Sequence, residues 1–157
     1  MRISYIDNSF ILIDNHLRAT GSRNTEIESL LTRAMLNIIY SCFEEKINEL
    51  IEIKLDQLPN PHLKYFTNSC LHAVLRDLRY TDISGFLGKF GEQFKLSFQS
   101  KADNDKIAIT FYGNIITNRH LVSHTSGLNC TFSELKLFYE KGHKILDYFS
   151  DTLNEII

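Results

Sequence analysis

The segment from Glu26 to Leu55 constrains the fold most strongly, because apolar residues recur along it every three or four positions without any glycine or proline. This spacing places the apolar side chains on one face of an α-helix. We therefore predict one long helix over these residues, with Thr25 capping its start and Leu58-Pro59-Asn60-Pro61 breaking the chain after it. A helix of this length with a broad apolar face favours a helical bundle in which it lies centrally.

The rest of the chain has the same helical character, because only 7 glycines and 2 prolines occur among its 157 residues. Before the long helix we predict a helix over 3–17, ended by Thr20-Gly21-Ser22. After it we predict a helix from 61 or 62 to about 80, followed by a short helical piece from a cap at 81–84 through Phe90. The remaining predicted elements are a helix over 103–124, an exit loop over 125–129 and a last helix from about 132 to 156. Thr131 and Glu134 fit a capping box at the start of the last helix. The length suggests a single domain over residues 1–157.

Composition limits the classes of function. A formal net charge of −2 and a pI of about 6.3 give no overall basic field, so any contact with RNA or DNA must be local. Cys42, Cys70 and Cys130 are odd in number and lack metal-ligand spacing, which favours buried reduced thiols and a cytoplasmic location. No run of 18 apolar residues occurs, so we expect no membrane span.

The polar segment from Asn118 to His124 is the main candidate for chemistry. Along the predicted helix, one stripe consists first of Ile109, Tyr112, Ile115 and Ile116 and then of Arg119, His120 and Ser123. Charged groups are rarely buried without partners, because desolvating them is costly. This end of the helix is therefore expected to reach solvent or to line a polar groove.

Histidine and arginine suit the cleavage of RNA by its own 2′-hydroxyl, which needs proton transfer and positive charge on the phosphorane oxygens. His124 could exchange the proton near neutral pH, and the planar donors of Arg119 could hold the phosphate. An offset of five residues separates these positions by about 140° around an ideal helix. Two copies of the chain facing each other across a symmetry axis could close the site.

A zinc site is the alternative reading of His120 and His124, which lie four residues apart and share a helix face. The glutamate of an HExxH motif is absent between them, and no third ligand is evident. We therefore expect no metal and no cofactor. The glycines of the segment 85–91 fit neither a P-loop nor a KH domain, and Asp77-Leu78-Arg79 with Asp82 is interpreted as a structural ion-pair network.

The segment Arg119-His120-Leu121-Val122-Ser123-His124 matches the R-x(4-6)-H motif of the HEPN superfamily, in which Asn, Asp or His commonly follows the arginine. The long helix from Glu26, the segment 82–91 and the Thr131-capped helix match as well. The chain most resembles the RiboL-PSP-type HEPN group over nearly its whole length. It departs from a frequent Ala-His-Gly ending of the motif, which is Ser123-His124-Thr125 here.

This resemblance implies an all-α, HEPN-like up-and-down helical bundle with a long central helix, commonly dimeric, that acts as a metal-independent endoribonuclease. Many relatives serve as toxins in toxin–antitoxin systems or as antiviral defence effectors. Carried over by position, Arg119 and His124 form the catalytic pair, and His120 orients or contacts the phosphate. Asn118 and Ser123 are expected to contact RNA.

The partners expected from the resemblance are an RNA substrate, a second copy of the chain, and an antitoxin or other defence-system protein. The alternative function is a non-catalytic HEPN dimer, in which Arg119 and His124 bind RNA or a partner protein without cleavage. A third interpretation is that both residues only cap and solubilise the end of their helix.

Overall fold

The computed structural model describes residues 1–75, 77–124 and 127–156, and it describes the backbone alone for residues 63, 71–74 and 124. The helices in these ranges are α1 (Ser4–Thr20), α2 (Glu26–Leu55), α3 (Pro61–Val74), α4 (Tyr80–Gly88), α5 (Glu92–Asp103), α6 (Lys106–His124), α7 (Phe132–Gly142) and α8 (Lys144–Glu155). The described ranges contain no β-strand. The predicted all-α bundle with a long central helix is confirmed.

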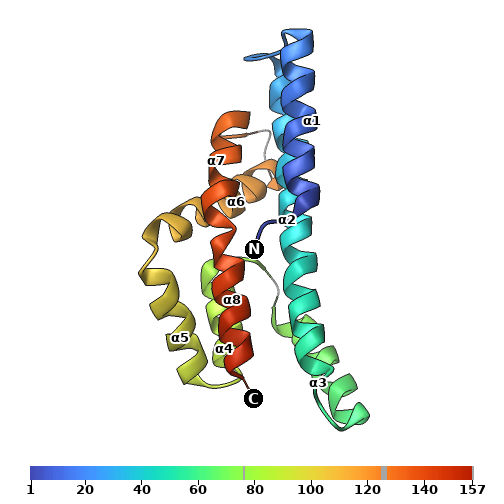
Figure 1. Ribbon diagram of the computed structural model, residues 1–157, viewed down its shortest axis with the longest axis vertical. Coiled ribbons are helices and arrows are strands. Elements are labelled where there is room, and N and C mark those ends of the chain that lie inside the picture. The colour runs from blue at the N-terminus through green and yellow to red at the C-terminus, as the bar shows by residue number, and fades with distance from the viewer. Residues whose placement is uncertain (76, 125–126, 157) are drawn as a thin grey trace.

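The helix α2 runs along most of the molecule, and α1 lies antiparallel beside its first half (Figure 1). Gly21 ends α1 in the left-handed conformation, with φ of 63°, which only glycine adopts at little cost. The predicted bounds of α2 are confirmed at both ends. Thr25 occupies the cap position, but its hydroxyl donates to the Ser22 carbonyl at 2.7 Å instead of accepting from the helix, so the predicted side-chain cap is wrong.

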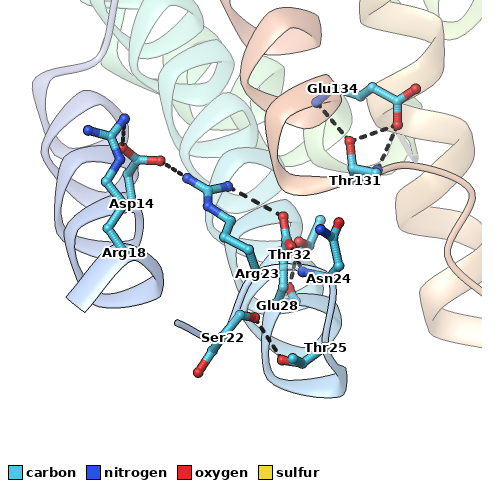
Figure 2. A network of polar contacts seen from close by, with 10 residues as sticks. All are labelled: Asp14, Arg18, Ser22, Arg23, Asn24, Thr25, Glu28, Thr32, Thr131 and Glu134. Atoms are coloured by element: carbon cyan, nitrogen blue, oxygen red, sulfur yellow. Dashed lines mark hydrogen bonds and ion pairs between the residues drawn. The ribbon is translucent and has the colours of Figure 1, made fainter. Parts of the chain in front are cut away.

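Polar contacts fasten the connection between α1 and α2. Figure 2 shows Arg23 between Asp14 of α1 and Glu28 of α2, with an ion pair to each carboxylate. The amide of Asn24 donates to Glu28 Oε2 at 2.6 Å. Glu28 is buried, so these partners offset the cost of removing its charge from water.

An aromatic cluster joins four helices at the centre of the molecule. Phe10 of α1 lies 5.4 Å from Phe132 and 5.7 Å from Tyr139 of α7, measured between ring centroids. Phe43 of α2 stacks on Tyr112 of α6 at 5.8 Å. All five rings are buried, and such pairs add to the stabilisation from apolar burial.

The helices α7 and α6 approach each other closely at Gly142. A Cβ atom at this position would lie 2.7 Å from the backbone nitrogen of Tyr112. Glycine is therefore required here by packing. The capping box that starts α7 is confirmed, because Thr131 Oγ1 accepts from the Glu134 amide at 3.2 Å and Glu134 Oε2 accepts from the Thr131 amide at 2.8 Å (Figure 2).

Several of the predicted boundaries are wrong. The first helix continues to Thr20, and the segment 81–84 lies inside α4, which ends at Gly88 instead of Phe90. The third helix ends at Val74 instead of about Tyr80, and the segment 75–79 links it to α4. The helix α5 was not predicted; it begins after Gly91, whose φ of 151° is open to glycine alone. The helix α6 begins at Lys106 and not at 103, because Asp105 accepts from the Ala108 amide at 3.1 Å and caps it.

The last predicted helix is two helices, α7 and α8, separated at His143. Apolar residues of both helices pack within the chain, because Leu135, Ile145 and Phe149 are fully buried. The predicted exit loop at 125–129 lies partly outside the described residues. Among the described helices, none combines the length and apolar character needed to cross a bilayer.

Candidate functional site

The last turns of α6 carry the residues predicted to form the site. Tyr112 and Ile115 are fully buried, whereas Arg119 and His120 are half-buried and Ser123 is exposed. The predicted change from an apolar to a polar stripe toward the end of this helix is therefore confirmed. Because α6 continues to His124, the whole motif shares one helical frame.

Arg119 stacks on Tyr40 of α2, with its Cζ atom 4.4 Å from the centroid of the ring. A guanidinium over an aromatic face is held by electrostatic attraction, which fixes its plane without using its N–H groups. Arg119 Nε is buried and has no hydrogen-bond partner among the described residues. The site therefore contains a cation whose orientation is set by the ring of Tyr40.

Asp77 lies in the link between α3 and α4 and connects four groups. Its Oδ1 accepts from the Tyr40 hydroxyl at 3.1 Å and from the Leu78 amide at 2.7 Å. Its Oδ2 lies 3.0 Å from Arg79 Nε and 3.1 Å from His120 Nε2. The His120 contact has an ion-pair distance but not the geometry of a hydrogen bond.

Tyr40 remains a neutral donor in this arrangement. Burial, followed by the charge of Asp77 and the hydrogen bond to it, raises the pKa of Tyr40 to about 12, and Arg119 opposes this only in part. The hydroxyl therefore keeps its proton at neutral pH and directs it to Asp77. Through these contacts α2, the 75–79 link and α6 together determine the positions of Arg119 and His120.

The link that carries Asp77 is itself anchored from α6. The Tyr112 hydroxyl donates to the Leu78 carbonyl at 2.7 Å in a buried environment. Desolvation raises the pKa of Tyr112 well above its usual value, so this donor is permanent under ordinary conditions. The carboxylate of Asp77, which faces His120, is thus next in sequence to a residue that is anchored on α6.

Two further predicted residues bond to the backbone. Asn118 is buried; its Nδ2 donates to the Asn114 carbonyl at 2.9 Å and its Oδ1 accepts from the Asn129 amide at 2.9 Å. It therefore connects α6 to the segment that precedes α7. Ser123 is exposed, and its hydroxyl donates to the Arg119 carbonyl at 3.0 Å.

His124 is the last residue of α6, and its side chain lies outside the described part of the chain. Helical geometry places positions 120 and 124 on the same side of α6. The same geometry separates positions 119 and 124 by about 140°. The backbone therefore retains the divergence between Arg119 and His124 that the sequence predicts.

A groove of about 440 Å³ lies beside His120. Its lining comes from the start of α4 and from one face of α6 and consists of Arg79, Tyr80, Gly113, Ile116, Thr117, His120 and Leu121. No local sequence pattern indicates this groove. Of its residues, the sequence patterns had indicated Arg79 in an ion-pair network, Ile116 in the apolar stripe, and His120 and Leu121 in the motif.

The described side chains include no group of three or more His, Cys, Asp or Glu residues that could hold a metal ion. The three cysteines are free thiols, as predicted, but the predicted burial is wrong, because Cys70 is exposed and Cys42 and Cys130 are only partly buried. Burial, assisted by the charge of Glu134, raises the pKa of Cys130 to about 11.

Comparison with known proteins identifies the family. The family model described as RiboL-PSP-HEPN matches residues 2–155, which is nearly the whole chain. Searches of curated proteins and of solved structures found no match. The match includes α2, the link with Asp77 and all of α6, so it covers every residue of the candidate site. The chain therefore belongs to the RiboL-PSP-HEPN family.

Proposed function

We propose that the protein is an endoribonuclease that cleaves RNA by attack of the RNA's own 2′-hydroxyl, without a metal ion. Domains of its family are generally ribonucleases. The observation that carries the proposal is the guanidinium of Arg119, which is oriented by stacking on Tyr40 and lies beside His120 near the end of α6. An oriented cation of this kind suits an anion that gains charge during reaction.

In the proposed reaction the 2′-oxygen forms a bond to phosphorus while the bond from phosphorus to the 5′-oxygen breaks. The products are a 2′,3′-cyclic phosphate and a free 5′-hydroxyl. The 2′-hydroxyl loses a proton and the 5′-oxygen gains one; His124 carries out one of these two transfers, and water carries out the other. Arg119 stabilises the phosphorane oxygens, and His120 contacts or orients the phosphate while Asp77 faces its Nε2.

We propose further that the active form is a homodimer. Positions 119 and 124 diverge by about 140° on one helix, so one copy does not enclose a phosphate with both side chains. Two α6 helices facing each other across a two-fold axis would supply the missing half of each site. A role as a toxin or antiviral defence effector, with an antitoxin or other defence-system protein as partner, is the corresponding cellular proposal.

The second candidate is a HEPN dimer that binds RNA or a partner protein without cleaving it. The observation that favours it is that Arg119 and His120 already have intramolecular contacts, with Tyr40 and Asp77. Contacts of this type also stabilise a fold. In this case substitution of Arg119 would weaken binding or folding, and no RNA would be cut.

The test uses purified protein, a pool of transfer and messenger RNA, and excess chelator. Arg119→Ala and His124→Ala are compared with wild type and with His16→Ala, a control at an exposed histidine on α1. We expect cleavage by wild type and by the control, and a loss of at least about a hundredfold in each motif variant. Cleavage that persists in both motif variants would refute the proposal, whereas tight RNA binding without cleavage by wild type would favour the second candidate.

A further inference from the structure

The groove beside His120 has the size and position of a ligand site next to the proposed reaction centre. Its volume of about 440 Å³ falls within the range of small-molecule pockets, about 300–1,000 Å³. We infer that this groove binds one unpaired nucleobase of the RNA substrate. The inference rests on the proposed function and adds the class of substrate to it, namely single-stranded RNA.

The lining suits a flat, partly polar aromatic ring. Ile116 and Leu121 of α6 supply apolar surface, and Tyr80 supplies an aromatic ring at the start of α4. The Tyr80 ring is itself stacked on Phe98 with centroids 5.3 Å apart, so its position is fixed. Unpaired bases in RNA are commonly bound by stacking on aromatic rings and arginine planes.

Polar groups border the same groove. Thr117 is exposed on α6 and can donate or accept a hydrogen bond at the edge of a base. Arg79 is largely exposed, and its Nε lies 3.0 Å from Asp77, which holds one edge of the guanidinium. Although the net charge of the chain is −2, the guanidinium of Arg79 thus provides a positive charge at the groove that RNA would approach.

The position of His120 connects the groove to the proposed chemistry. His120 lines the groove and belongs to the same turn of α6 as Arg119. A base in the groove would therefore bring its own phosphates to the last turns of α6, where the motif lies. Bases in an A-form duplex are paired and stacked and cannot enter a groove on a protein surface, so the geometry selects single strands.

Gly113 offers a direct test, because a Cβ at this position would meet no atom within 4 Å. A leucine here would project into the groove without displacing the backbone. Gly85 of α4 also has open space around it, is exposed and does not line the groove. Gly113→Leu and Gly85→Leu therefore form a matched pair, and Gly113→Ala gives an intermediate volume.

Binding is measured by fluorescence anisotropy with a 2′-O-methyl oligoribonucleotide, which cannot be cleaved through a 2′-hydroxyl. The probes are a single strand of mixed sequence, the same strand in a duplex, and an oligomer of equal length without bases. Stacking contributes about 1–3 kcal/mol per base, so we expect Gly113→Leu to weaken single-strand binding about tenfold. Gly113→Ala should weaken it less, and Gly85→Leu should match wild type.

The results separate the groove from the proposed chemistry. Equal affinity of Gly113→Leu and wild type for the single strand would overturn the inference, and so would an equal loss in Gly85→Leu. The oligomer without bases should bind wild type and Gly113→Leu alike; a tenfold loss there would show that the groove binds backbone. If wild type cleaves RNA and Gly113→Leu binds the single strand as tightly as wild type, only the inference of base binding in the groove is refuted. If binding depends on the bases but no RNA is cleaved, only the proposed ribonuclease activity is refuted.

Discussion

Replacing Gly142 with alanine should destabilise the bundle at the contact that positions α6. The added Cβ would lie 2.7 Å from the backbone nitrogen and 2.9 Å from the Cα atom of Tyr112. Ordinary contacts begin at 3.4 Å, so the two helices must separate locally by about 0.7 Å. Both obstructing atoms belong to the backbone, so no side-chain rotation relieves the clash.

The energetic balance follows from two opposing terms. Overpacking of a close contact costs about 1–3 kcal/mol. Alanine gains about 0.5–1 kcal/mol over glycine in a helix, and less at the last residue of α7. We expect a net loss of about 1–2 kcal/mol in the free energy of unfolding, which corresponds to a fall of about 2–8 °C in the Tm of a domain of this size.

Urea unfolding at equilibrium measures this change, with Gly85→Ala as the matched control. A Cβ at Gly85 meets nothing within 4 Å, so the control should be as stable as wild type or more stable by up to about 1 kcal/mol. In Gly142→Ala the urea concentration at the midpoint of unfolding should fall, while the slope of the unfolding free energy against urea concentration should stay constant. Equal stability of Gly142→Ala and wild type would contradict the close approach of α7 and α6.

Three further predictions concern the capping box, the buried tyrosine and the thiols. Thr131→Ala should lower the free energy of unfolding by about 1 kcal/mol, whereas Thr131→Ser should retain most of it; equal losses in urea unfolding would contradict a cap made by the hydroxyl. Asp77→Asn should lower the pKa of Tyr40 from about 12 toward 10, because it removes a negative charge that disfavours the phenolate. The pKa is measured by ultraviolet titration with Tyr40→Phe as the blank, and an unchanged titration curve would argue against the contact between Asp77 and Tyr40. Cys130, with its pKa raised to about 11, should be alkylated at neutral pH more slowly than the exposed Cys70, as measured by mass spectrometry; equal rates would show that Cys130 is accessible as a thiolate.

Local signals explain which helices the sequence predicts well. The bounds of α2 follow from periodic apolar residues between a polar turn and two prolines, and the start of α7 follows from its capping box. The break after Val74 has no such signal. It depends on distant partners, because Leu78 accepts from Tyr112 and Asp77 from Tyr40, and single-sequence patterns do not contain such contacts.

The candidate site divides in the same way. Arg119 and His120 are found from a local motif, because polar groups replace an apolar stripe on one helix. Tyr40 lies 37 residues before Asp77 in the sequence, and Asp77 belongs to a segment that was predicted to be helical. Their meeting with Arg119 and His120 depends on the packing of α2 against α6 and is visible only in three dimensions.

Analysis of the RNA ends formed in excess chelator tests the central claim most directly. A substrate cut at one mapped position is compared with the same RNA carrying a single 2′-deoxynucleotide on the 5′ side of that cut. Attack by the 2′-hydroxyl predicts that the unmodified RNA is cut to give a 2′,3′-cyclic phosphate and that the deoxy-substituted RNA is not cut at that position. Arg119→Ala should cut neither RNA. Products with a 5′-phosphate and a 3′-hydroxyl, or unchanged cutting of the deoxy-substituted RNA, would contradict the proposed chemistry.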